Sequence, residues 1–180
     1  MPNTPNDLIA AGYLARRQGR PQQAKEAFVE SVGWCRGRTD QVLLLASALV
    51  GLGQVERDLK NERLALQHYQ EAVEIYRNGP DRLRLAHTIR HVADILREAG
   101  SLEEARPHYE EALNIYRDNP ETSRLDLANT IRGFALLRAE SGETETAKSL
   151  REEARRLYQL VDVRAGVEES DAQLERLSAK

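Results

Sequence analysis

The sequence is poor in the features that mark secreted, membrane-spanning or disulfide-rich proteins. Cys35 is the single cysteine, so no disulfide can form within the chain, and a reducing compartment is expected. The longest apolar stretch, residues 42–52, has about half of the ~20 residues that a membrane-spanning helix needs. Met1–Asp7 lacks the basic start of a signal peptide, and no apolar run follows it. We therefore expect a cytoplasmic protein.

Aromatic residues are also few, and the net charge is small. Phe, Trp and Tyr make up 5% of the 180 residues, whereas alanine and leucine are abundant, which favours helices over a β-sandwich. The formal net charge is −3, so the composition gives no general attraction to nucleic acid or to an anionic membrane. With 41% hydrophobic and 31% charged residues, the chain has a globular composition.

Motifs for cofactor binding and nucleophilic catalysis are missing as well. An apolar run followed by Gly51-Leu52-Gly53 imitates the start of a dinucleotide-binding loop, but Glu56 stands where the third glycine is needed. No P-loop and no nucleophile elbow occurs. We expect no cofactor and no enzymatic activity.

The main positive feature of the sequence is an internal repeat. Residues 104–117, EARPHYEEALNIYR, recur at 64–77 as LALQHYQEAVEIYR, and more divergent copies lie at 23–36 and 146–159. The equivalent alanines of the four copies, Ala24, Ala65, Ala105 and Ala147, are separated by 41, 40 and 42 residues. A period of this size indicates stacked supersecondary units, each of which buries its apolar face against the next.

Apolar residues within each unit recur at spacings of three and four, which predicts helices throughout. Gly-Pro and Asn-Pro turn signals separate them at Gly79-Pro80 and Asn119-Pro120. We predict an all-α, right-handed superhelical solenoid of nine helices in a single domain. Its parts are repeat 1 (5–36), repeat 2 (40–77), repeat 3 (81–117), repeat 4 (121–160) and a capping helix (162–178).

Two helix starts carry specific capping signals. Thr4-Pro5 looks like an N-cap followed by proline at the first helical position, with Asp7 in the first turn. Ser101 and Glu104 have the spacing of a capping box for a helix that begins at Leu102.

The conserved spacing within each copy resembles the tetratricopeptide repeat. In the second copy the pattern is Leu49, Leu52-Gly53, Ala65, Tyr69 and Ala72, and the other copies follow it in register. The period exceeds the ~34 residues of the standard repeat and is similar to the longer variety of kinesin light chains and many bacterial proteins. The fourth copy departs from the pattern at Arg151, where an aromatic residue is expected, so we expect looser packing there.

The resemblance implies a non-catalytic scaffold whose partner is a protein or peptide, because the first helices of tetratricopeptide repeats line a concave groove that receives a peptide. The facing positions would be Tyr13, Arg16, Gln54, Arg57, His87, Arg90, His91, Asp94, Arg97, Asn129 and Arg132. The lysine- and asparagine-rich carboxylate clamp of chaperone-binding members is not reproduced.

Two arginines favour an acidic peptide as the ligand. Arg90 and Arg132 lie 42 residues apart within matching Leu-Ala-x-Thr-Ile-Arg strings, on successive first helices. Their guanidiniums would suit carboxylates of an extended segment. The alternative is that they only solvate this face.

Two other classes of function remain as alternatives. RNA binding needs a continuous basic stripe with aromatic residues between, but Asp58, Asp94, Glu98 and Glu140 interrupt the arginines. His87 and His91 lie one helical turn apart and would suit Zn²⁺, although Thr88 replaces the glutamate of the metalloprotease motif. The sequence does not identify the partner and leaves homo-oligomerisation open.

Overall fold

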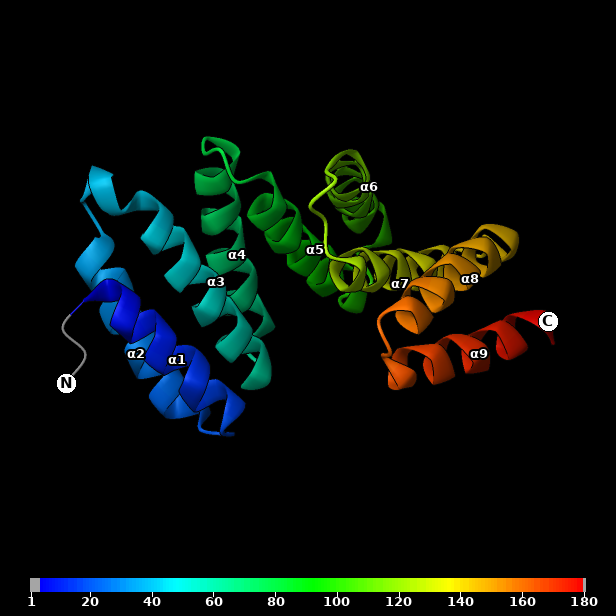
Figure 1. Ribbon diagram of the computed structural model, residues 1–180, viewed down its shortest axis with the longest axis horizontal. Helices are drawn as coiled ribbons and strands as arrows, with labels where there is room; N and C mark the ends of the chain where they lie inside the picture. The colour runs from blue at the N-terminus through cyan, green and yellow to red at the C-terminus, as the bar shows by residue number, and fades with distance from the viewer. Residues whose placement is uncertain (1–3, 180) are drawn as a thin grey trace. The chain divides into compact units, whose positions relative to one another are not determined.

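The structure is a computed structural model that describes residues 4–179, and its regular structure over that range is entirely helical (Figure 1). The prediction of an all-α fold with nine α-helices is confirmed for this range, which also contains a 3₁₀ turn at Thr39–Gln41. No helix among these is long and apolar enough to cross a membrane. The helices are α1 (Pro5–Arg17), α2 (Pro21–Cys35), α3 (Val42–Asp58), α4 (Glu62–Arg77), α5 (Arg82–Glu98), α6 (Leu102–Asp118), α7 (Arg124–Glu140), α8 (Thr144–Leu160) and α9 (Arg164–Ser178).

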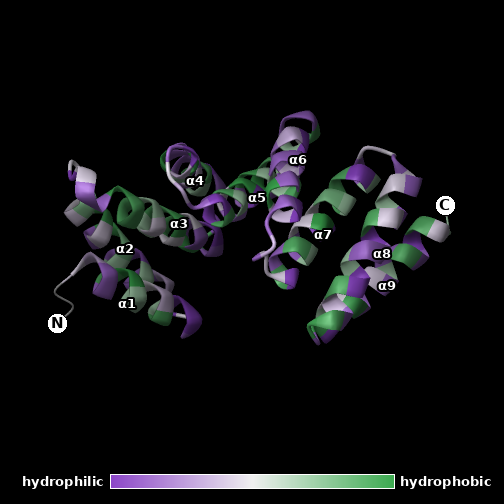
Figure 2. Ribbon diagram, turned by 45° about the horizontal axis from the view of Figure 1, so that its top comes forward, coloured by the Kyte–Doolittle hydropathy of each residue, from purple (hydrophilic) through white to green (hydrophobic). Residues whose placement is uncertain are grey.

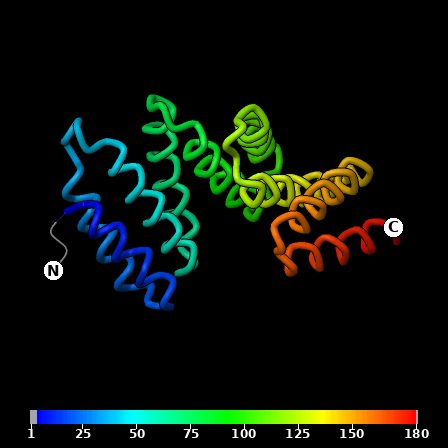
Figure 3. The backbone as a smooth tube through the Cα atoms, viewed as in Figure 1, coloured from blue at the N-terminus to red at the C-terminus, as the bar shows by residue number. Residues whose placement is uncertain are grey.

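The chain divides into two compact units, and the boundary falls within α5. The N-terminal unit extends to Thr88 and the C-terminal unit starts at Ile89; each is described by itself below. Short turns join consecutive helices, as the tube in Figure 3 shows. Hydrophobic and hydrophilic residues are mixed along the helices in Figure 2, as expected for helices that bury one face. The grouping into four repeats and a capping helix stays a prediction.

The N-terminal unit is built around aromatic rings that lie against helix glycines. Phe28 of α2 is fully buried, and its ring contacts both Gly12 of α1 and Gly51 of α3. A Cβ atom added at Gly12 or Gly51 would lie only 2.7 or 2.2 Å from that ring. Tyr69 of α4 lies in the same way against Gly53 of α3, where an added Cβ would be 2.8 Å from the ring. Small residues therefore let the helices approach closely enough for each ring to fill the space between them.

In the C-terminal unit, too, an aromatic ring packs against a helix glycine. Tyr109 of α6 is fully buried, and an added Cβ at Gly133 of α7 would lie 2.8 Å from its ring. The core around it consists of Ala93, Ala105, Leu113, Ala128, Ile131, Phe134, Leu137, Ala154 and Tyr158. All four register alanines, at positions 24, 65, 105 and 147, are fully buried, as expected where helices approach closely.

The expectation of looser packing at Arg151 is wrong. Arg151 is only 1% exposed and takes the place of the missing aromatic ring in α8. Its Nη1 atom donates to Oε1 of Glu169 on α9 at 3.3 Å. The long aliphatic stem of arginine can fill space next to apolar neighbours while its guanidinium finds a carboxylate. The position is thus filled by a buried charge that is paired across two helices.

The two predicted N-terminal caps behave differently. Thr4 has the extended backbone of an N-cap (φ −131°, ψ 156°), and its hydroxyl accepts a hydrogen bond from the amide of Asp7 at 3.2 Å, as predicted. Ser101 makes no side-chain cap hydrogen bond, so the predicted capping box with Glu104 is wrong. Its ψ of 60° differs from the extended ψ of 128° at Ser123, whose hydroxyl does cap α7. The backbone at Ser101 thus lacks the extended conformation of the Thr4 and Ser123 caps, which do form.

A buried carboxylate links α2, α3 and the start of α4. Glu56 is 1% exposed, and its Oε1 atom lies 2.8 Å from Nζ of Lys25, while Oε2 accepts a hydrogen bond from Asn61 at 2.8 Å. Burial alone would raise the pKa of Glu56, but these two hydrogen bonds hold it below its usual value. Glu56 is therefore charged and paired in the folded protein.

The Gly51→Ala substitution should destabilise the N-terminal unit by about 3 kcal/mol, because the added methyl group overlaps the buried Phe28 ring. The matched control is Gly33→Ala in α2, where an added Cβ would meet no atom within 4 Å. That change should stabilise the protein by about 0.5–1 kcal/mol through helix propensity. Urea unfolding followed by circular dichroism measures both, and equal free energies of unfolding for the two variants would contradict the packing described here.

The Glu56→Gln substitution should lower the free energy of unfolding at about pH 7 by roughly 2 kcal/mol, because charge-assisted hydrogen bonds to Lys25 and Asn61 are lost. The pKa of Glu56 is lower in the folded protein than in the unfolded chain. Its contribution is therefore present above the unfolded pKa of about 4.3 and disappears as the pH falls through the folded pKa. Unfolding curves at several pH values should show the difference between variant and wild type shrinking toward acid.

The control for this pH series is Glu103→Gln, since the Glu103 side chain is 88% exposed. It should have little effect on stability at any pH. A constant gap between Glu56→Gln and wild type from neutral to acid pH would show that the carboxylate is not ionised in the folded state.

Candidate functional site

The predicted groove positions are divided between the two units. Tyr13, Arg16, Gln54, Arg57 and His87 belong to the N-terminal unit. Arg90, His91, Asp94, Arg97, Asn129 and Arg132 belong to the C-terminal unit. The structure brings Tyr13 and His87 to one cavity, and it places Arg16, Gln54 and the residues of the C-terminal unit in ion pairs or hydrogen bonds.

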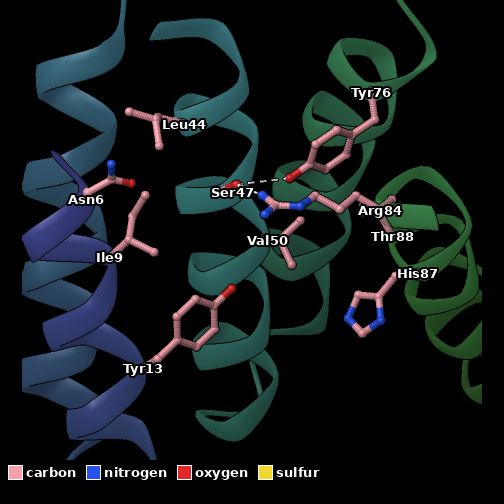
Figure 4. A pocket seen from close by; sticks show the side chains of 10 residues that line it. All are labelled: Asn6, Ile9, Tyr13, Leu44, Ser47, Val50, Tyr76, Arg84, His87 and Thr88. Carbon is pink, nitrogen blue, oxygen red and sulfur yellow. Dashed lines mark hydrogen bonds between the residues drawn. The ribbon is translucent and has the colours of Figure 1, made fainter. Parts of the chain in front are cut away.

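A cavity of about 290 Å³ lies in the N-terminal unit, and Figure 4 shows the side chains around it. Four helices contribute to its wall: α1, α3, the end of α4 and the first half of α5. The lining residues are Asn6, Ile9, Tyr13, Leu44, Ser47, Val50, Tyr76, Arg84, His87 and Thr88. The wall thus combines aliphatic side chains with hydroxyls, an imidazole and one guanidinium.

Arg84 is held in a fixed orientation at this wall. Its Nη1 atom donates to Oγ of Ser47 at 2.6 Å, and its Nε atom lies 3.1 Å from a carboxylate oxygen of Asp81 (Figure 4 shows the Ser47 contact). The Ser47 hydroxyl donates to the carbonyl of Leu43 and lies 3.2 Å from the Tyr76 hydroxyl. A hydrogen bond with Tyr76 also raises the pKa of the Arg84 guanidinium. The cation is positioned before any ligand arrives.

Tyr13 and the aliphatic residues form the other part of the wall. The Tyr13 ring packs edge-on against Phe28, with ring centroids 5.0 Å apart and an angle of 77° between the planes. Burial raises the pKa of Tyr13, so its hydroxyl stays protonated and can donate at neutral pH. Ile9, Leu44 and Val50 offer apolar surface beside it. The cavity can therefore take a group with an aliphatic body and an acceptor end.

Arg16 is already occupied within the N-terminal unit. Its Nε and Nη2 atoms donate to the two carboxylate oxygens of Asp58, at 2.6 and 3.2 Å, and its Nη1 atom donates to the side chain of Gln54 at 3.0 Å. This bidentate pair joins α1 to α3. Two of the predicted groove residues, Arg16 and Gln54, thus contact each other, and Arg57 is half-buried one turn further along α3.

The C-terminal unit holds a hydrogen-bonded network around Asp94. One oxygen of Asp94 accepts from the Tyr109 hydroxyl at 2.6 Å, and the other pairs with Nη1 of Arg90 at 2.8 Å. The Nη2 atom of Arg90 lies 3.1 Å from Nε2 of His91. Burial and the neighbouring Asp94 carboxylate both raise the pKa of Tyr109. Three predicted groove residues, Arg90, His91 and Asp94, therefore form one cluster on α5.

The remaining predicted residues of this unit are paired as well. Arg97 pairs with Glu140 at 2.7 Å, and Arg132 pairs with Glu169 of α9 at 2.5 Å. Asn129 accepts a hydrogen bond from the Tyr158 hydroxyl at 2.8 Å. Each predicted arginine of the C-terminal unit thus has a carboxylate partner within the chain. This face does not present the uncompensated positive stripe that single-stranded nucleic acid requires.

A family model described as tetratricopeptide repeat matches three overlapping stretches of the chain, residues 7–78, 44–118 and 81–159. The chain belongs to the tetratricopeptide repeat family. No curated protein matches the sequence.

Solved structures show the same repeat fold. The chain is similar to BtubC (BKLC) from P. vanneervenii, with 15% identity, a TM-score of 0.72, and coverage of 97% of this chain and 79% of that one. It is similar to the apo form of RapI at 13% identity, with a TM-score of 0.80 and coverage of 88% and 57%. Aspartyl phosphate phosphatase F from Bacillus subtilis is 11% identical, with a TM-score of 0.81 and coverage of 93% and 43%.

These likenesses bear on the fold alone, because the identities are low. The alignment with this chain covers little more than half of the length of RapI and less than half of the length of the phosphatase. The helical-repeat architecture predicted from the sequence is confirmed by the family match and by all three structures.

The two histidines considered for a metal have other surroundings. His87 lines the cavity, and His91 faces the Arg90 guanidinium, which would oppose a cation at Nε2. Within the described part of the chain, no group of three or more His, Cys, Asp or Glu side chains is arranged to hold a metal ion.

Sequence reasoning missed most of the cavity wall, although the repeat register contained a signal for Ser47. Asn6, Ser47, His87 and Asn129 are separated by 41, 40 and 42 residues, the same intervals as the register alanines. His87 and Asn129 were predicted to face the groove, so Asn6 and Ser47 belong to the same row. Arg84 has no counterpart of this kind, since the equivalent positions hold Leu44 and Asp126.

Two tyrosines of α6 provide a matched test of the Asp94 network. Tyr109→Phe should lower the free energy of unfolding by about 1–3 kcal/mol, because the partly buried Asp94 carboxylate loses a donor. Tyr116→Phe should be close to neutral, because the buried Tyr116 hydroxyl has no hydrogen-bond partner within the described residues. Chemical denaturation of both variants measures the difference, and equal losses would show that the Tyr109–Asp94 bond adds no stability.

Proposed function

We propose that this tetratricopeptide repeat protein is a protein-interaction scaffold that binds an extended, acidic peptide segment, with the cavity of the N-terminal unit as its main recognition site. The observation that carries this proposal is the fixed Arg84 guanidinium beside an aliphatic wall. The cavity volume of about 290 Å³ suits one or two residues of a peptide and is small for a cofactor. No catalytic role is proposed for any residue.

The geometry of the cavity supports a carboxylate as the polar group. Arg84 is held beside the aliphatic wall by Ser47 at Nη1 and by Asp81 at Nε. Guanidinium donors match carboxylates better than neutral carbonyls, since the hydrogen bonds are charge-assisted. Tyr13 and His87 lie on the same wall and add further donors. An acidic residue with aliphatic neighbours would satisfy both parts of the wall.

The C-terminal unit supports the same ligand class in a weaker form. Arg90 and Arg132 are the two repeated arginines that first indicated an acidic ligand, and both are paired with carboxylates in the structure. A ligand carboxylate would have to compete with Asp94 or Glu169 for them. We therefore propose that Arg90, Arg97 and Arg132 contribute long-range attraction and that the cavity contributes the specific contact.

The experiment is a binding titration with a fluorescein-labelled peptide of alternating glutamate and alanine, followed by fluorescence anisotropy. The wild-type protein should bind it, with an affinity that falls as NaCl rises from ~50 to ~500 mM, because screening weakens exposed charge pairs. Arg84→Gln should weaken binding by roughly three- to tenfold, since the Arg84 side chain is 58% exposed and its contacts are partly screened.

The control variant is Arg36→Gln, which removes an arginine of the same unit whose partner is Glu71 on α4, away from the cavity. It should bind the peptide as tightly as wild type does. A peptide of alternating lysine and alanine should not bind. Equal loss in Arg36→Gln and Arg84→Gln would reduce the interaction to net charge and contradict the cavity as the recognition site.

A further inference from the structure

Helix α9 lies on the C-terminal unit through a narrow and mostly polar face. Only Gly166 and Ser170 of α9 are fully buried, and neither carries a large apolar side chain. Gly166 lies so close to Tyr158 of α8 that an added Cβ would be 2.5 Å from the ring. Val163 and Val167 are partly buried against the core. Leu174 and Leu177 are half-buried as well, so no large apolar side chain of α9 is fully buried.

Two arginines under α9 share one carboxylate. Glu169 accepts from Nε of Arg132 on α7 at 2.5 Å and from Nη1 of Arg151 on α8 at 3.3 Å. The Arg151 side chain is 2% exposed, and its Nε atom is buried with no hydrogen-bond partner within the described residues. The surface that α9 covers is therefore built for negative charge and is incompletely satisfied by the carboxylate that occupies it.

The charges around this surface leave a positive excess. Besides Arg132, Arg151 and Glu169, two ion pairs contribute no net charge to it: Arg90 with Asp94 of α5 at 2.8 Å, and Arg155 of α8 with Asp171 of α9 at 2.5 Å. Two guanidiniums thus face one carboxylate. A buried cation that shares its only carboxylate with a second arginine is incompletely compensated, so this surface would favour a second anionic group.

We propose that the face of α7 and α8 under α9 is a docking site for an acidic helix of a partner protein, with α9 as its resident occupant. The helix that fits presents a glycine against Tyr158, a glutamate three residues later between Arg132 and Arg151, and a small residue next, as Gly166, Glu169 and Ser170 do. A further acidic side chain would meet the unsatisfied edge of Arg151. This site goes beyond the peptide cavity, because its ligand is helical and the surface is covered at rest.

The covalent link explains why α9 prevails in the isolated protein. A tethered helix has an effective concentration in the millimolar range, so a free helix must bind more tightly or the resident helix must be weakened. Neutralising Glu169 weakens the resident helix, because its carboxylate contacts both Arg132 of α7 and Arg151 of α8, whereas the pair of Arg155 with Asp171 is left intact. Neighbouring Glu168 provides the matched control, since it pairs with Arg164 of the same helix.

The test uses full-length Glu169→Gln and Glu168→Gln proteins and a fluorescein-labelled synthetic peptide of residues 161–179 as the acidic helix. The Glu169→Gln protein should bind this probe at least about tenfold more tightly than the Glu168→Gln protein, the loss expected for a charge-assisted contact. A probe that itself carries Glu169→Gln should show no such preference. Adding Arg132→Gln and Arg151→Met to the Glu169→Gln protein should abolish the gain.

A second measurement covers the case in which Glu169→Gln protein loses helix content. Hydrogen exchange of wild-type protein is then followed by mass spectrometry with the native probe in millimolar excess, and exchange in resident α9 should rise while α5 and α6 stay protected. The probe with Glu169→Gln should leave exchange in α9 unchanged. Equal binding of both probes, equal binding by both protein variants, or unaltered exchange in α9 would overturn the proposal.

Discussion

The packing of this chain depends most on the contact between an aromatic ring and a glycine of a facing helix. Phe28 meets Gly51, Tyr109 meets Gly133, and in each case the glycine leaves no room for a methyl group. A glycine inside a helix lowers intrinsic helix stability, and that loss is offset by burying a ring that contacts two helices. Because ring and glycine lie on different helices, the packing couples the sequences of neighbouring repeats.

Where the ring is missing, the chain replaces apolar packing with electrostatic pairing. Arg151 occupies the aromatic position and reaches Glu169, so the last helix is held by an ion pair in addition to the contact between Gly166 and the Tyr158 ring. The two kinds of contact differ in their response to solvent: apolar burial is insensitive to moderate salt, whereas ion pairs weaken with screening and with loss of the carboxylate charge. The contact between Arg151 and Glu169 should therefore weaken at high salt or low pH, whereas the contact of a ring with a glycine should not.

The fold could be predicted from the sequence because a single register, marked by Ala24, Ala65, Ala105 and Ala147, repeats with nearly constant spacing. Features that depend on one torsion or on a distant partner could not. The capping box at Ser101 fails through its ψ angle, and Arg151 is buried because Glu169 lies opposite it. The predicted groove arginines have carboxylate partners as many as 43 residues away, which local spacing does not reveal.

Because these arginines are paired within the chain, their repetition is weaker evidence for a common ligand. Arg90 and Arg132 occupy matching positions, which suggested a common ligand, yet Asp94 of the same helix neutralises one and Glu169 of α9 neutralises the other. Identical residues in a repeat array can therefore differ in availability, because neighbours outside the motif decide their charge balance. Arg84 lies outside the repeated motif and still presents a positioned guanidinium beside an apolar wall. The proposed recognition therefore centres on Arg84, since a donor already fixed by Ser47 needs less ordering when a ligand binds.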